Sequence, residues 1–122
     1  MKRLGLSALI LAAATGTAFA DWQLYRKDKA VVASVNYLSF ASFRHQPSVW
    51  VRWHYVTPRK GVAGVKIHFT ANCSKHRLYE IASLPYDTGG NYLADNEHPD
   101  TPREYPIRPR SLNEATYKLL CR

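Results

Sequence analysis

The strongest constraint on the fold is a pair of cysteines, Cys73 in the middle of the chain and Cys121 beside its last residue. In an exported chain, two cysteines most simply form one disulfide. Such a bond would close a loop of about 48 residues, which the chain-entropy treatment values at about 4 kcal/mol of stability. That is a large share of the total stability of a small domain. We therefore expect a disulfide that ties the end of the chain to its middle.

Residues 1–20 have the pattern of a signal peptide. A basic start at Lys2 and Arg3 is followed by an apolar run and by an A-x-A cleavage site at residues 18–20. The apolar run is too short to span a bilayer, and no cysteine follows the cleavage site to carry a lipid. The sequence predicts one mature domain over residues 21–122, exported to the periplasm, the extracellular space or the cell surface, without a lipid anchor or a membrane span.

The end of the chain predicts a helix over residues 111–121. Ser111 and Glu114 have the spacing of a capping box, in which the hydroxyl and the carboxylate each accept an unpaired backbone N–H. Apolar residues then recur at helical spacing. The expected apolar stripe consists of Leu112, Ala115, Leu119 and Leu120, with Tyr117 beside it.

Alternating apolar and polar residues predict β-strands in the first two-thirds of the chain. The strongest candidate spans residues 48–56, and residues 65–72 and 77–84 follow it. These three strands favour an antiparallel meander. The core side of the two central strands would carry Val49, Val51, Trp53, Tyr55, Val65, Ile67, Phe69 and Ala71. The other expected elements are strands at 22–26, with Trp22, Leu24 and Arg26 on one face, and at 30–35, an irregular stretch at 36–43 and a basic hairpin loop at 57–64.

Residues 85–110 differ from the rest of the chain. They contain five of the seven prolines and show no regular period, apart from a possible edge strand at residues 105–107. They also contain five of the nine acidic residues, although the whole chain has a formal net charge of +8. A basic exported domain suggests an acidic partner, such as a membrane surface, a sulfated glycan, nucleic acid or an acidic protein patch. The alternative is that the positive charge serves solubility alone.

The outer face of the central strands is the candidate binding surface. Cations interleaved with aromatic side chains suit anionic or stacking ligands. Two alternatives remain open: the helix or a partner subunit covers Trp50, or this face is the surface of a homodimer. The candidate residues are Trp50, Arg52, His54, Lys66 and His68 on the strands, with Arg59 and Lys60 at the hairpin tip.

Catalytic signals are weak. The sequence has no G-x-S-x-G, H-E-x-x-H, P-loop or C-x-x-C motif, and a disulfide would consume both thiols. His54 and His68 could hold a transition metal if the strand register brings them together, or they could be two solvated histidines. We expect no enzymatic activity, no cofactor and no metal.

The order of several motifs resembles the surface-adhesin protein E family of Gram-negative bacteria. A tryptophan opens the mature chain, a V-x-V-x-W strand follows, and the next strand ends in Cys73. Residues 77–81 precede Tyr86-Asp87, and the chain closes with the pattern P-x-S-x-x-E ending at Cys121. The resemblance covers most of residues 22–122, and only the two cysteines carry over, as a structural pair.

This resemblance implies an α+β fold: an antiparallel sheet of about six strands, with the C-terminal helix on one face and tied by the disulfide. It also implies surface display, binding to host extracellular matrix proteins such as laminin and vitronectin, and possible dimerisation. We therefore expect an exported, non-enzymatic binding protein for host matrix or another acidic macromolecule, with no nucleic acid as partner. The alternatives are a periplasmic accessory or structural protein with a protein partner, and a small hydrolase or metal-binding protein.

Overall fold

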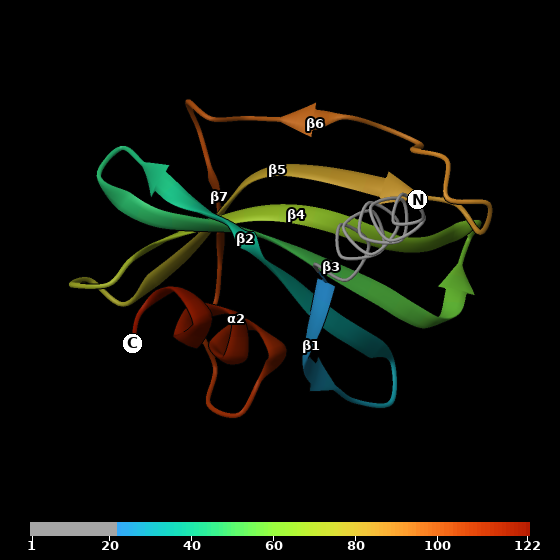
Figure 1. Cartoon of the computed structure of the whole chain (residues 1–122), viewed down its shortest axis with the longest axis horizontal. Helices are drawn as coiled ribbons and strands as arrows, with labels where there is room; N and C mark the ends of the chain where they lie inside the picture. The colour runs from blue at the N-terminus through green and yellow to red at the C-terminus, as the bar shows by residue number, and fades with distance from the viewer. Residues whose placement is uncertain (1–21) are drawn as a thin grey trace, which may run out of the picture.

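The strands predicted from alternating residues form an antiparallel meander in the computed structural model, which describes residues 22–122 (Figure 1). Two short strands pair with the outer edge of β5, and one helix packs against the sheet, so the predicted α+β class is confirmed. The predicted signal peptide lies outside the described residues. The elements are β1 (Trp22–Lys27), β2 (Val31–Phe43), β3 (Gln46–Arg59), β4 (Val62–Asn72), β5 (Arg77–Tyr86), β6 (Asn96–Glu97), β7 (Arg103–Tyr105) and α2 (Leu112–Leu120).

The central hairpins are longer and tighter than the sequence predicted. The strands continue through both the irregular stretch at 36–43 and the loop at 57–64, which leaves turns of only two residues. The two turns are Arg44-His45, with φ of 49° and 67°, and Lys60-Gly61, with φ of 51° and 83°. Two consecutive residues with positive φ match the right-handed twist of the flanking strands. Only one of these four positions is a glycine, so neither turn has a strong signal in the sequence.

The core lies between the sheet and α2. Val51, Ile67 and Phe69 are its centre, and Tyr117 and Leu120 of the helix pack onto them. The face predicted for the core is therefore correct, with Trp53 and Val65 at its margin. We call this helix-covered side the inner face and the opposite side the outer face. Figure 1 shows α2 on one side of the central strands and the segment that carries β6 on the other.

The helix begins as predicted, although its cap and buried side differ in detail. Ser111 Oγ accepts a hydrogen bond from the Glu114 amide at 3.1 Å. The Glu114 carboxylate accepts from the Arg110 amide at 2.9 Å, instead of from Ser111 as a standard capping box requires. The buried residues are Thr116, Tyr117 and Leu120, whereas Leu112, Ala115 and Leu119 of the expected stripe are only partly buried. The prediction missed Thr116 because it is polar.

Thr116 is buried because it belongs to a chain of hydrogen bonds between the sheet and the helix. Trp53 Nε1 donates to the Tyr25 phenol at 2.8 Å, and the Tyr25 and Thr116 hydroxyls are 2.8 Å apart. Thr116 Oγ1 then donates to the Leu112 carbonyl at 3.0 Å. Burial raises the pKa of Tyr25 to about 12, so the phenol keeps its proton and remains a donor in this chain.

A bulge in β1 brings Arg26 to the same face as Tyr25. The register of β1 against β2 shifts between Leu24 and Arg26, and Tyr25 is the extra residue at this bulge. Arg26 then turns to the inner face, where its guanidinium donates to the carbonyls of Arg110 and Ser111. The prediction that Trp22, Leu24 and Arg26 share one face is therefore wrong for Arg26.

The predicted disulfide is present between Cys73 and Cys121, whose Cα atoms are 5.5 Å apart. It joins the turn after β4 to the residue that follows α2. The Tyr117 phenol donates to the Cys73 carbonyl at 3.1 Å, so a hydrogen bond supports the same connection. The end of the chain is thus fixed to the sheet both covalently and by packing.

Residues 85–110 are organised around a buried carboxylate. Glu80 of β5 is only 4% exposed, and the Tyr105 phenol of β7 donates to one of its oxygens. His98 Nε2 lies 2.9 Å from the other oxygen, although the two atoms are not aligned as a hydrogen bond. Burial, followed by the bond to Glu80, raises the pKa of the Tyr105 phenol. The edge strand expected at 105–107 lies at Arg103–Tyr105 instead, where Tyr105 can reach Glu80.

Candidate binding face

The strand register aligns the outer-face residues in rows that cross the sheet. Residues directly opposite each other in antiparallel strands share a face and touch. The first row contains Trp22, Asn36, Trp50, His68, Ala82 and Glu97. The second contains Leu24, Ser34, Arg52, Lys66 and Leu84, and the third Lys27, Val32, His54, Gly64 and Tyr86. Five of the seven predicted binding residues therefore lie together, on β3 and β4.

The second row holds two cations directly opposite each other, Arg52 and Lys66. The Trp22 ring lies by both, with its centroid 5.1 Å from Arg52 Cζ and 5.6 Å from Lys66 Nζ. Lys66 also donates to the Tyr92 phenol at 2.8 Å. Aromatic rings can stabilise cations, but no carboxylate within residues 22–122 forms an ion pair with either one. The two positive charges are therefore not balanced by a described carboxylate.

The first row holds an aromatic stack. The rings of Trp50 and His68 lie 4.8 Å apart and are nearly parallel, at 11°. Burial lowers the pKa of the His68 imidazole below its usual range, because the charged form would lose its hydration. His68 is therefore neutral at pH 7 and adds aromatic surface to this face instead of charge.

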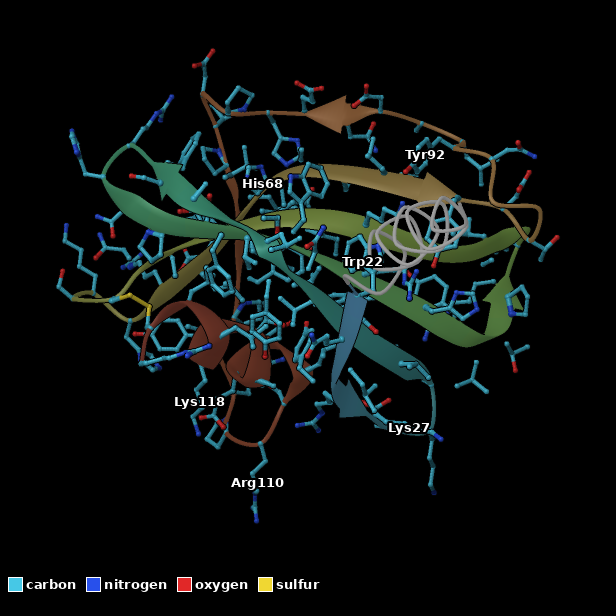
Figure 2. The ribbon with its side chains drawn as sticks, viewed as in Figure 1. Trp22, Lys27, His68, Tyr92, Arg110 and Lys118 are labelled. Carbon is cyan, nitrogen blue, oxygen red and sulfur yellow. A yellow bond between two sulfur atoms is a disulfide. The ribbon has the colours of Figure 1, made fainter. Side chains whose placement is uncertain are left out.

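The helix does not cover Trp50, because it packs on the inner face. The segment around β6 lies beside Trp50 instead, and together they enclose a hollow of about 250 Å³. Figure 2 shows His68 and Tyr92 on the side of the sheet away from α2, with Lys118 and Arg110 beside the helix. The residues that line the hollow are Trp50, His68, Ile81, Ala82, Leu84, Asp95, Glu97 and Pro99.

The two histidines considered as metal ligands do not meet. His68 lies opposite Trp50, whereas His54 lies opposite Gly64, two rows away. His54 Nδ1 instead lies 2.9 Å from the Tyr86 phenol, whose ring crosses over Gly64. Within the described residues, no group of three His, Cys, Asp or Glu side chains is placed to hold a metal ion. The hypothesis of a His54–His68 metal site is wrong.

The hairpin cations lie away from this face. The register shifts between His54 and Arg59, and the Arg59 guanidinium lies 4.4 Å from the ring centre of Tyr55, an inner-face residue. Lys60 occupies the turn itself. The outer face instead gains Trp22, Tyr86 and Tyr92, which the sequence analysis did not select. Tyr92 had no signal because it lies in the segment without a period.

Comparisons with models of known protein families, with curated proteins and with solved structures found no match. Across residues 22–122, no helix has the length and apolar character needed to cross a membrane. The function must therefore be argued from the face itself.

Proposed function

We propose that this is an exported, non-enzymatic binding protein that holds an acidic macromolecule on the outer face of its sheet. The observation that carries the proposal is the Arg52–Lys66 pair. Like charges directly opposite each other destabilise a sheet, and no described carboxylate compensates them. A cation pair that costs stability, held on two central strands, is better explained by a ligand than by folding.

The neighbouring rings suit a macromolecular ligand. Trp22 and Tyr92 lie by the cations, so an incoming acidic group would meet positive charge while its apolar parts contact aromatic surface. The resemblance to surface-adhesin protein E makes host matrix proteins of the laminin and vitronectin type the first partners to test. Sulfated glycans offer the same acidic chemistry.

The test is binding of the purified protein to immobilised laminin, vitronectin and heparin across a salt series. We expect saturable binding that weakens with salt, because screening acts on exposed charges. The variant R52Q/K66Q should lose about tenfold in affinity, since each exposed ion pair contributes up to about 1 kcal/mol. The matched control, K29Q/K75Q, removes the same charge from two exposed turns and should bind nearly as well as the unmodified protein.

Two results would contradict the proposal. One is no binding to any of the three surfaces at low salt. The other is equal loss in R52Q/K66Q and K29Q/K75Q, which would reduce the effect to net charge. Sedimentation of the same samples tests the homodimer.

A second candidate is a periplasmic accessory protein with a protein partner. It is favoured by an exposed apolar cluster where β2 departs from the register of β3, between Asn36 and Ala41. Leu38 is 79% exposed there, and the rings of Tyr37 and Phe40 stack at 5.8 Å. Retention of the processed protein inside the outer membrane would favour this candidate, and its display on the cell surface would oppose it.

A further inference from the structure

The hollow beside Trp50 exists because a small residue interrupts a row of large ones. In the first row, Ala82 separates His68 from Glu97. Its single methyl group leaves open the space that a longer side chain would fill. The Trp50–His68 stack and Leu84 supply aromatic and aliphatic wall, and Ile81 and Pro99 supply more apolar surface. The result is a hollow of about 250 Å³, large enough for a small organic group.

The rim of this hollow is negative in a chain that is positive overall. Asp95 and Glu97 both line it, and neither forms an ion pair within residues 22–122. Of the other acidic residues of the same segment, Asp100 pairs with Arg44 and Glu104 pairs with Arg77, whereas Asp87 accepts hydrogen bonds from two backbone amides of its own turn. Asp95 and Glu97, which lie beside the aromatic stack, thus have no cation partner among the described residues, in a protein with a net charge of +8.

We propose that this hollow binds an organic ammonium group, with the Trp50–His68 stack as its aromatic wall and Asp95 and Glu97 as its counter-charges. Indole and other aromatic faces attract ammonium ions, and methyl groups on the nitrogen would contact the apolar wall. The carboxylates favour a cation over a neutral group of the same shape. This site differs in charge from the neighbouring Arg52–Lys66 pair, and the inference does not depend on the proposed function.

Two kinds of ligand could present this chemistry: a quaternary ammonium compound and the primary ammonium of a lysine side chain. The probes are therefore tetramethylammonium, choline and N-acetyl-lysine amide. The neutral control is 3,3-dimethylbutanol, which has the shape of choline without its charge. Binding is followed by the backbone amide signals of Trp50, His68 and Glu97 in two-dimensional NMR spectra of the purified protein.

We expect at least one ammonium probe to shift these signals saturably at millimolar concentration, while dimethylbutanol binds at least about fivefold more weakly. The relative affinities of choline and the lysine amide then decide which kind of ammonium is preferred. Neutralising the rim in D95N/E97Q should weaken binding at least threefold. The control D100N/E104Q removes the same charge from the same segment, outside the hollow, and should leave the affinity unchanged.

A second variant fills the site without changing its charge. Ala82→Val should abolish the saturable shifts, and its circular dichroism spectrum and unfolding midpoint show whether the sheet is intact. If A82V does not fold, the comparison of D95N/E97Q with D100N/E104Q still decides the question. The inference is overturned if no ammonium probe binds, if dimethylbutanol binds equally well, or if the two acidic double variants lose the same affinity.

Discussion

Removal of the disulfide gives the sharpest test of how the fold is held together. The bond joins residues 48 apart in sequence, and the loop that it closes contains β5, β6, β7 and α2. For a loop of this size the chain-entropy treatment predicts a loss of about 4 kcal/mol when both cysteines become alanine. The effect arises in the unfolded chain, which gains freedom once the bond is absent. The folded core between α2 and the sheet should persist.

The assay is equilibrium unfolding in urea, for the oxidised protein and for C73A/C121A. For a domain of this size, with a slope of about 1.3 kcal/mol per molar urea, a loss of 4 kcal/mol lowers the midpoint by about 3 M. A decrease in stability below about 1 kcal/mol would refute the entropic reasoning, because most of the expected loop-closure contribution would then be absent.

A second substitution separates the unfolded-state effect from loss of helix packing. Thr116→Val removes the hydroxyl that connects Tyr25 to α2, and should cost about 1–3 kcal/mol because a buried polar group loses its partner. Thr116→Ser retains the hydroxyl and is its control. If the disulfide acts only on the unfolded chain, Thr116→Val should cost the same with and without it. If that cost disappears in the cysteine-free protein, the helix has already left the sheet and the argument fails.

Two other residues of the outer face give further predictions. Gly64→Ala should destabilise the protein by about 1–3 kcal/mol, because the added Cβ would lie 2.7 Å from the Trp53 carbonyl oxygen and closer still to the Tyr86 phenol; an urea midpoint equal to that of the unmodified protein would contradict this. The lowered pKa of His68 means that the unfolded chain binds a proton before the folded protein does, so stability present above about pH 6.5 should fall as the pH drops through that value and below it. An NMR titration should place the His68 midpoint below that of free histidine, and His68→Gln should show a shallower loss of stability in acid; a midpoint at or above the usual value would contradict the assignment.

Much of the fold could be predicted because its signals are local. Val49 and Val51 alternate with polar residues, Ser111 and Glu114 have the spacing of a helix start, and the two cysteines leave one possible pairing. The predictions that were wrong concern residues whose face depends on the strand register. The bulge at Tyr25 changes the face of every later residue in β1, and no local pattern reports it.

The candidate site shows the same division. Arg52 and Lys66 could be placed on one face from alternation alone, and the structure puts them directly opposite each other. Arg59 was expected at the hairpin tip of this face, but beyond the register shift after His54 its guanidinium lies against the ring of Tyr55, an inner-face residue. Tyr92 and the rim of the hollow come from a segment whose path is set by long-range contacts, above all those of Tyr105 and His98 with Glu80. Such contacts leave no period in the sequence.

The short strands β6 and β7 have a consequence for solubility. β5 is ten residues long, and an uncovered edge of that length would offer unpaired backbone groups to any other extended chain. β6 pairs with Ala82 and Ser83, and β7 pairs with Leu78 to Glu80, so much of that edge is already occupied. The prolines around them cannot donate to a further strand. The proline-rich segment thus protects one side of the sheet from edge-to-edge aggregation, a useful property for a protein expected to work outside the cytoplasm.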